Sequence, residues 1–382
     1  MKIEFGKPLI DTKELKEVEK TLSQPTLVHG KKTEIFEEMF KNFVKSKYAI
    51  TVSSCTAGLH LAYKALGICS GDEVIVTAQS HVATAHAIEF VGAKPVFVDC
   101  ELDFGNIDIN LIESKITKKT KAISVVHFLG MPVDMIKLKK LADKHNLKII
   151  EDCALAVGSK INSKHVGNFG DVGCFSFYPV KHMTTIEGGM VITNNKQLAK
   201  YIKKARAFGY EKNLNLLKQN KLYDVDVLGL NYRMNEVQST IGICQLSKIK
   251  SFLEIRAENN FNLRKNLSSV EDFFLLKDSF KNFTHSNYCV SLILGPNLKY
   301  KRKIIIEKLK KKGIGTSIYY PGPIPDFSFY KEKYNTNAKN FPKAKCISSF
   351  SLALSVGPHL RKKHMNFISK NLKEIIKDEV KE

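Results

Sequence analysis

Lys181 is the residue best placed for covalent chemistry with an aldehyde. It stands in SFYPVKHMTTIEGGM (176–190), after an apolar run and before two glycines that let backbone approach closely. A lysine amine that is shielded from water in such a turn has a lowered pKa and can form an imine. A lone turn lysine is more often a solvated surface residue, so the chemical interpretation depends on supporting residues elsewhere.

Asp152, in IIEDCALAVG (149–158), is the first such support. An acid directly after a buried strand can be a helix N-cap. Its carboxylate can instead keep a pyridine nitrogen protonated, so that the ring acts as an electron sink. Glu151 is the neighbouring alternative, but strand alternation points it to the other face of the sheet. Both readings of Asp152 stay open on this residue alone.

The segment SSCTAGLHLA (53–62) runs from a predicted strand into a predicted helix. Small hydroxyl residues before a helix are first of all N-caps. The same position offers free N–H groups at the positive end of the helix, where a phosphate binds. A phosphate segment, a strand-end carboxylate and a turn lysine, in that order, fit one cofactor, pyridoxal 5′-phosphate (PLP).

His81, in QSHVATAHAI (79–88), opens a helix after the next strand. It is either a partly exposed loop histidine or an aromatic ring that stacks on a planar cofactor. Metal ligation together with His86 is disfavoured, because residues i and i+5 do not share a helix face and no third ligand is apparent.

The elements that must position these residues indicate an α/β sheet. Short β-branched runs alternate with helical periodicity, giving strands at 48–52, 73–77, 94–99, 121–127 and 147–152 and helices at 56–67, 82–91, 108–117 and 134–145. Strands separated by such helices form parallel crossovers, covered by helices on both faces. Ligands gather beyond the carboxyl ends of these strands, where Ser53, Ser54 and Asp152 fall.

The second half of the chain changes pattern. Residues 172–178 and 189–193 predict two strands joined by the turn that carries Lys181, and 235–267 predicts one long helix. Further on come a strand at 287–294, a Lys-rich helix ending at Gly313, the segment 313–320, a Pro- and Gly-containing loop at 321–326 and a helix at 363–377. We therefore predict a large PLP-binding domain at 1–250, with a mostly parallel central sheet, and a small α+β domain at 251–382.

Composition limits the kinds of partner. The net charge of +22 is explained first by lysines spread over the predicted helices, next by an acidic substrate and least by nucleic acid, since no basic–aromatic stripe is present. No apolar run reaches the roughly 18 residues of a membrane span, and the first ten residues do not suit a signal peptide. Eight scattered cysteines without a CxxC pair suit a reducing compartment. We expect a cytoplasmic protein with no membrane partner.

The chain resembles the DegT/StrS family of nucleotide-sugar aminotransferases, which are fold-type I PLP enzymes, from about residue 7 to 375. Four collinear motifs carry the resemblance: FEEMFKNFVKSKYAITVSSCTAGLHLAYKALGI, GDEVIVTAQSHVATAHAIEFVGAKPVFVD, SFYPVKHMTTIEGGM and LGLNYRMNEVQSTIGICQL. Together with a lysine in the expected turn, they form a specific signal.

The resemblance implies which residues hold the cofactor. Lys181 would bind it as a Schiff base and then move the proton between the cofactor and the substrate carbon. Asp152 would pair with the pyridinium nitrogen. Thr56, Ala57 and Ser176 would hold the phosphate.

The resemblance also implies residues around the cofactor. His81 would lie over the pyridine face, and Asn231 would reach the phosphate of the neighbouring subunit's cofactor, which implies a homodimer with shared active sites. Arg233 would bind the amino donor's carboxylate through its bidentate geometry. Tyr178 and His182 are further candidates for substrate binding.

Three positions bear on how far the family pattern applies. Leu155 stands where many members carry Gln or His near the cofactor's phenolic oxygen, so that contact is absent or supplied elsewhere. The loop PGPIPD (321–326) lacks the histidine that many members have there. A dehydratase branch replaces the Schiff-base lysine with histidine, whereas this chain keeps Lys181 beside His182, which favours transamination.

The implied function is amine transfer from glutamate, or less favourably glutamine, to a 4-keto- or 3-keto-6-deoxy sugar linked to a nucleoside diphosphate. The product would serve a bacterial surface polysaccharide or other glycoconjugate. Two alternatives stay open. One is PLP-dependent sugar dehydration or cyclitol amination, and the other is a non-catalytic regulatory member that binds nucleic acid and tolerates loss of Lys181.

Overall fold

The computed structural model describes residues 1–211 and 223–381. Its centre is a seven-stranded sheet of order β1-β9-β8-β5-β4-β2-β3. Four of the six pairings are parallel, and β9 runs antiparallel to both of its neighbours, which confirms the mostly parallel sheet. The strands are β1 (Tyr48–Val52), β2 (Glu73–Thr77), β3 (Lys94–Val98), β4 (Thr120–Val126), β5 (Lys148–Asp152), β8 (Val172–Ser176) and β9 (Gly189–Thr193).

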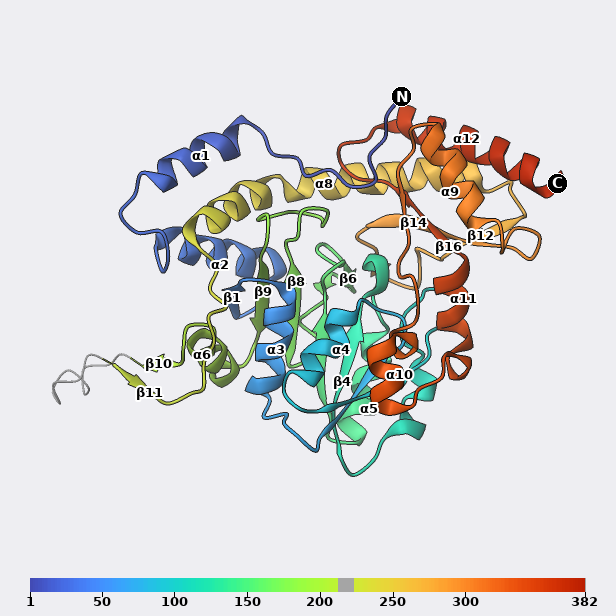
Figure 1. Ribbon diagram of the computed structural model, residues 1–382. Helices are drawn as coiled ribbons and strands as arrows, with labels where there is room; N and C mark the ends of the chain where they lie inside the picture. Colours follow the sequence, from blue (N-terminus) through green and yellow to red (C-terminus); the bar gives the residue numbers. More distant parts are fainter. Residues whose placement is uncertain (212–222, 382) are drawn as a thin grey trace.

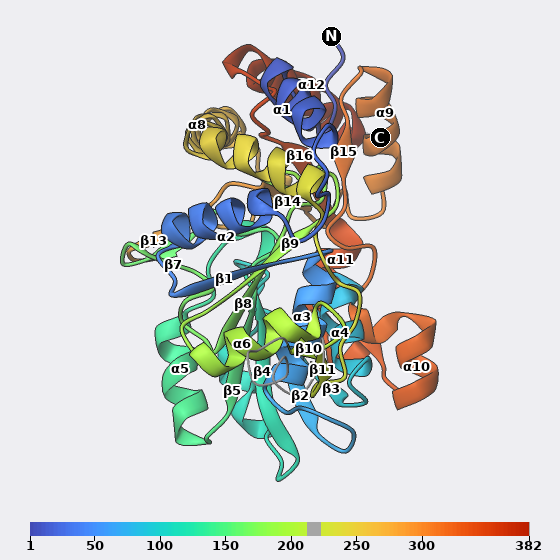
Figure 2. The same cartoon turned by 90° about the vertical axis from the view of Figure 1, so that its left-hand side faces the viewer.

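Helices cover both faces of this sheet (Figures 1 and 2). Alternate residues of β8 show the two sides, because Cys174 packs in the same cluster as α3, whereas Phe175 packs against Phe40 of α2. The first face carries α3 (Cys55–Ala65), α4 (Val82–Glu89) and α6 (Lys196–Ala205). The second carries α2 (Lys31–Val44), α5 (Met135–Lys144) and the long α8 (Glu236–Leu267).

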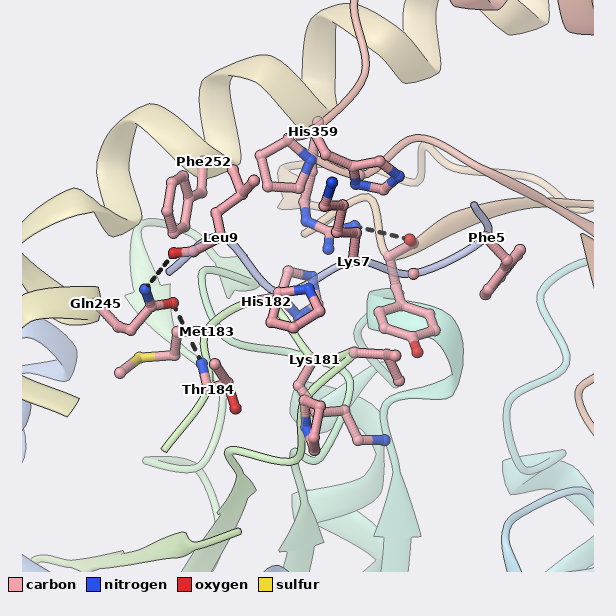
Figure 3. A pocket seen from close by; sticks show the side chains of 18 residues that line it. Phe5, Lys7, Leu9, Lys181, His182, Met183, Thr184, Gln245, Phe252 and His359 are labelled. Atoms are coloured by element: carbon pink, nitrogen blue, oxygen red, sulfur yellow. Dashed lines mark hydrogen bonds between the residues drawn. The ribbon is translucent and has the colours of Figure 1, made fainter. Parts of the chain in front are cut away.

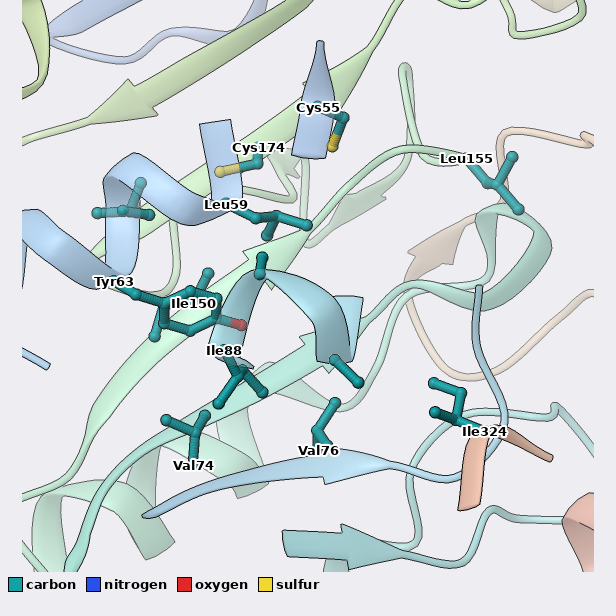
Figure 4. Packing of buried hydrophobic residues seen from close by; sticks show 14 of the residues in the cluster. Cys55, Leu59, Tyr63, Val74, Val76, Ile88, Ile150, Leu155, Cys174 and Ile324 are labelled. Atoms are coloured by element: carbon teal, nitrogen blue, oxygen red, sulfur yellow. The ribbon is translucent and has the colours of Figure 1, made fainter. Parts of the chain in front are cut away.

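A layer of buried apolar side chains packs α3 and α4 against the sheet. Leu59 and Tyr63 of α3 and Ile88 of α4 lie over β2 and β5 (Figure 4). Tyr63 is fully buried and donates to Ser124 Oγ at 2.7 Å, so its polar end is satisfied. Each such apolar side chain stabilises the fold by about 1.5–3 kcal/mol, and together they hold the first turn of α3 against the carboxyl end of β5.

A second sheet of order β12-β14-β16-β15 forms the C-terminal part. It consists of β12 (Phe273–Leu275), β14 (Cys289–Leu294), β15 (Thr316–Ser317) and β16 (Ser351–Ser355), and it packs with α9 (Arg302–Lys311), α12 (Lys362–Lys381) and the second half of α8. Ile3 also belongs to this core and bridges to Ile314. Since α8 continues through residue 250, the boundary between 1–250 and 251–382 falls inside one helix and stays a prediction.

The remaining elements lie at the edges. They are α1 (Thr12–Leu22), which packs on α8, α10 (Ser328–Tyr334), α11 (Pro342–Phe350), the pair β10 (Tyr210–Glu211) and β11 (Asp224–Val225), and the small sheet of β6 (Lys160–Ile161), β7 (Lys164–His165) and β13 (Phe283–Thr284). None of the helices in the described ranges combines the length and the hydropathy of a membrane span.

One predicted helix is wrong, and the structure assigns a form to a segment that the sequence left open. The helix expected at 108–117 is a pair of 3₁₀ turns, η1 (Ile109–Leu111) and η2 (Glu113–Lys115). Ile109 and Ile112 are both buried and stand three residues apart, which is the repeat of a 3₁₀ helix. The segment 313–320 forms a strand only at β15, because its last two tyrosines leave the sheet and line the cavity described next.

Candidate active site

The carboxyl ends of β4, β5 and β8 open into a cavity of about 620 Å³. A ligand of small-molecule size fits such a volume. Six of the predicted site residues line it: Thr56, His81, Asp152, Ser176, Tyr178 and Lys181. The structure therefore brings together most of the residues that the sequence pointed to, across more than 120 positions of the chain.

Lys181 lies in the turn between β8 and β9. Its backbone N–H donates to the Tyr178 carbonyl at 2.9 Å, and its Nζ is 5.8 Å from the centroid of the Tyr288 ring. Burial lowers the pKa of Lys181 below its ordinary value, while the nearby Cys55 and Asp152 act in the opposite direction. The amine is thus more readily neutral than that of a solvated lysine, as attack on an aldehyde requires.

Asp152 ends β5 and is 5% exposed. Its Oδ2 accepts from Thr84 Oγ1 at 2.8 Å, and its Oδ1 accepts from the Ala154 backbone N–H at 3.0 Å. The residues that follow Asp152 form turns and not a helix. Its bond with the Ala154 N–H therefore stabilises a turn, and Asp152 is not a helix N-cap. Its carboxylate lies against the first turns of α3 and α4, at the floor of the cavity.

Glu151 points to the opposite face, which confirms the expected alternation. Its two oxygens accept from the backbone N–H groups of Gly167, Phe169 and Gly170 at 2.6–2.7 Å and from His127 Nε2 at 3.1 Å. Burial favours the neutral acid, but the His127 hydrogen bond and attraction and the backbone donors outweigh it, so the pKa of Glu151 is lowered.

Hydrogen bonds engage two of the three side chains in a group that could otherwise hold a metal ion. His127, Glu151 and Cys153 bring possible ligand atoms within 4.8 Å of one another. However, His127 Nδ1 accepts from the Val133 N–H at 3.1 Å, and its Nε2 donates to Glu151, so both ring nitrogens are engaged. The hydrogen bonds of His127 and Glu151 connect the end of β4, strand β5 and the turn 167–170.

The first turn of α3 carries the predicted phosphate segment. Ser54 is the N-cap, and its Oγ accepts from the Ala57 N–H at 3.1 Å. The Ala57 amide predicted to bind phosphate is therefore engaged by the cap. Cys55 and Thr56, the first two residues of the helix, have amides with no acceptor inside it. Ser176 is buried on the neighbouring strand β8 and lines the same cavity.

His81 and Tyr178 lie at the cavity rim. His81 is the N-cap of α4, its Nδ1 accepts from the Ala83 N–H at 3.2 Å, and its ring centroid lies 5.5 Å from that of Tyr320. The Nε2 atom therefore carries the proton of the neutral ring. Tyr178 is exposed. Both rings can contact a ligand that fills the cavity from its open side.

Three tyrosines that the sequence did not single out form the opposite wall. Tyr288, Tyr319 and Tyr320 come from the C-terminal part and line the cavity. The hydroxyls of Tyr288 and Tyr319 lie 2.9 Å apart, and burial raises the pKa of Tyr319 to about 12. Neutral phenols are hydrogen-bond donors for a polar ligand. In the sequence these tyrosines stand at the ends of apolar runs, which could have marked them as candidates. Their large distance from Lys181 along the chain gave no reason to assign them to its site.

His182 lies in a separate, small hollow behind the lysine turn (Figure 3). Its Nε2 donates to the Ser286 carbonyl at 3.0 Å, and burial lowers its pKa well below the ordinary value. Arg256 and His359 line the same hollow. The structure thus separates His182 from the large cavity, where a substrate contact was predicted.

Asn231 and Arg233 lie outside the cavity of their own chain. Asn231 is exposed and forms an antiparallel bridge with Ala207. The Arg233 guanidinium lies 4.9 Å from the Phe208 ring centroid and 3.4 Å from His29 Nε2. Neither residue is among those that line the cavity, so the predicted contacts of both stay predictions.

The chain is similar to known aminotransferases over almost its whole length. A model of the DegT/DnrJ/EryC1/StrS aminotransferase family matches residues 8–373. This chain is 36% identical to a GDP-perosamine synthase of Escherichia coli O157:H7. It is 37% identical to a UDP-4-amino-4,6-dideoxy-N-acetyl-beta-L-altrosamine transaminase of Campylobacter jejuni, and in both cases the similarity covers 90% of each chain. A putative sugar aminotransferase of Streptococcus pneumoniae, solved in its PLP form, superposes with a TM-score of 0.93 at 25% identity, covering 99% of this chain and 100% of that one.

The cavity fits the cofactor of that family, which is PLP. A buried carboxylate with donors on both oxygens suits a cationic ring nitrogen. A lysine amine with a lowered pKa suits an aldehyde, and the start of α3 suits a phosphate. These three features line one cavity.

Proposed function

The chain belongs to the DegT/DnrJ/EryC1/StrS aminotransferase family, a family of PLP-dependent enzymes, and we propose that it transfers an amino group from glutamate to a keto-deoxy sugar linked to a nucleoside diphosphate. The observation that carries the proposal is the cavity that joins Lys181, Asp152 and the first turn of α3 at one end of the sheet. The sugar class rests on the names of the relatives, which act on GDP- and UDP-linked amino sugars.

When bound, PLP supplies an aldehyde carbon and a ring that accepts electrons. Lys181 attaches the cofactor and, once released from it, moves a proton at the substrate carbon. Asp152 holds the ring nitrogen in its charged form, and the hydrogen bonds that its two oxygens accept from Thr84 and Ala154 support this role. Cys55 and Thr56 offer amides to the phosphate, with Ser176 and the helix dipole in support.

The acceptor sugar fits the remaining side of the cavity. Tyr319 offers a neutral phenol there, and Tyr178 and His81 border the open side. Hydroxyl groups of a sugar match these donors, whereas a purely apolar ketone would leave them unsatisfied. The excess of lysine and arginine over acidic residues suits a substrate that carries a diphosphate.

We propose a homodimer in which each chain completes the other's site. The surface beside Asn231 carries exposed apolar side chains, among them Val225 and Leu228, the second of which is 78% exposed. Exposed apolar side chains that stand close together in the chain suit a protein–protein contact. Asn231 would reach the partner's cofactor phosphate, and Arg233 would meet the amino donor's carboxylate.

We place the enzyme in the cytoplasm, at the step that aminates the sugar before surface polysaccharide or glycoconjugate assembly. Six of its eight free cysteines are buried, as in proteins of reducing compartments. A Bacillus subtilis relative, 31% identical, is named as a spore coat polysaccharide biosynthesis protein.

The proposal is tested by incubating the purified protein with PLP, ¹⁵N-labelled glutamate and a panel of nucleotide-linked 3-keto and 4-keto sugars. We expect the label in one amino sugar, detected by mass spectrometry, with Lys181→Ala as the inactive control. Labelled product from a free cyclitol ketone, and from none of the nucleotide sugars, would instead select cyclitol amination. Loss of the sugar hydroxyl without amine transfer would select dehydration.

A further inference from the structure

Thr84 holds the carboxylate that is placed to meet the cofactor's ring nitrogen. We infer that Thr84 is a positioning residue that fixes Asp152 so that a single acceptor site, on Oδ2, is left for that nitrogen. The inference rests on the proposed role of Asp152 and extends it to the residues that determine its geometry. It begins from the 2.8 Å contact between Thr84 Oγ1 and Asp152 Oδ2.

The direction of this contact follows from the chemistry of its two ends. An ionised carboxylate only accepts hydrogen bonds, so the Thr84 hydroxyl must donate. Its oxygen then accepts from Ser80, whose Oγ lies 2.9 Å away. Ser80 and Thr84 are both buried, so water does not compete for these bonds. The result is an ordered chain of donors from Ser80 through Thr84 to Asp152.

The other oxygen of Asp152 is already engaged. Oδ1 accepts from the Ala154 N–H at 3.0 Å and from Cys55 Sγ at 3.9 Å. Burial, with the charge of Asp152 second, raises the pKa of Cys55 well above its ordinary value, so the thiol keeps its proton and remains a donor, though a weak one. Cys55 is the first residue of α3 (Figure 4), so this contact joins the start of α3 to the end of β5.

Counting acceptor sites then gives the inference. A carboxylate has about four lone-pair sites, two on each oxygen. Ala154 and Cys55 take those of Oδ1, and Thr84 takes one of Oδ2. The remaining site lies on the oxygen that Thr84 holds. The Thr84 bond therefore fixes the orientation of that site and stabilises the charged carboxylate, which keeps the proton on the ring nitrogen.

The experiment compares two ligands that differ only at that nitrogen. Dissociation constants are measured on the apo-protein for PLP and for its analogue in which a C–H replaces the ring nitrogen, by absorbance titration after dialysis. The proteins are wild type, Thr84→Val, Thr84→Ser and Thr193→Val. The last removes another buried threonine hydroxyl, which donates to the Asp171 carbonyl at 2.7 Å at the opposite end of the sheet.

We expect Thr84→Val to weaken PLP binding about 10- to 100-fold, the effect of losing a hydrogen bond to a charged group, and to leave the analogue within about threefold. Thr84→Ser should restore PLP binding, and Thr193→Val should change neither ligand. Equal losses for both ligands in Thr84→Val would reduce Thr84 to a structural residue, and no loss for PLP would remove its role. A wild type that does not distinguish the two ligands would overturn the role of Asp152 itself, and with it the proposed function of this carboxylate.

Discussion

The end of β5, which lines the cavity, and the segment 223–235, which we propose to serve a partner's site, are built in opposite ways. At β5, Glu151 and Asp152 are buried, and both oxygens of each carboxylate accept hydrogen bonds from the chain's own donors. In 223–235, Asn231 and Leu228 are exposed, and neither lines the cavity of its own chain. The β5 end of the site, the cofactor half, is thus built by contacts within one chain, whereas the role that we propose for the segment 223–235 depends on a second chain.

The largest expected effect is at the cofactor half. Lys181→Ala should lower the rate of amine transfer by about 10⁴-fold or more, because it removes both the covalent attachment and the proton carrier. Lys181→Arg is the matched control, since it keeps the positive charge but forms no imine. Activity is measured by single turnover with labelled glutamate. An active Lys181→Arg variant would mean that the positive charge alone supports amine transfer, and it would contradict the covalent role of Lys181.

The pH dependence of cofactor attachment tests whether Lys181 is the residue that binds PLP covalently. Because the folded-state pKa of Lys181 is lowered from 10.5, the neutral amine is present at lower pH than in a solvated lysine. Borohydride fixation of PLP to the peptide containing Lys181 should therefore pass its midpoint below pH 10.5. Label on a different lysine would contradict the assignment.

A mixed dimer tests whether the segment 223–235 belongs to the partner's site. Lys181→Ala and Asn231→Ala should each be nearly inactive. When the two are mixed and refolded together, half of the dimers are hybrids with one intact site each, so roughly a quarter of the wild-type activity should return. The rate is measured after mass spectrometry has confirmed the hybrids. No recovery would place both residues in the site of the same chain.

Glu151→Gln tests the rigidity of the cofactor half. The amide replaces a buried charge that accepts four hydrogen bonds, so the free energy of unfolding should fall by about 3 kcal/mol at pH 7, measured by urea denaturation. The folded-state pKa of Glu151 is lowered from 4.5. The contribution of the ionised Glu151 to the free energy of unfolding is therefore fully present above pH 4.5. It is lost as the pH falls through the lower pKa that Glu151 has in the folded protein. The difference between variant and wild type should narrow below about pH 4.

The smallest effect concerns Ile186, in the lysine turn. Its φ of 70° lies in the left-handed region, which a β-branched residue rarely adopts, and its side chain is 57% exposed. Ile186→Gly should raise the free energy of unfolding by about 1 kcal/mol, after the larger chain entropy of glycine in the unfolded state is counted. A loss of stability in the dimer but not in dilute monomer would show that Ile186 contacts the partner.

Much of the cofactor half was predictable because its signals are local. Asp152 follows a β-branched run, and Ser54 precedes a helix, so alternation and capping place both at one edge of the sheet. The tyrosine wall was not predictable, because Tyr288 and Tyr319 reach Lys181 only through the packing of a second sheet. The 3₁₀ turns at 109–115 were also missed, since their buried isoleucines fit a helical period as well. His182 was wrongly placed because it is next to Lys181 in sequence, yet it does not line the large cavity that Lys181 lines.

Helix α8 has a consequence for how such genes can exchange parts. Its 32 residues span about 48 Å, beginning beside the Asn231 segment and ending in the core of the second sheet, while Ile3 returns the start of the chain to that core. A recombination event at residue 250 would join two half-helices whose buried faces were selected against different partners. Viable chimaeras between relatives should therefore exchange α8 whole, and carry the first residues of the chain together with its last third.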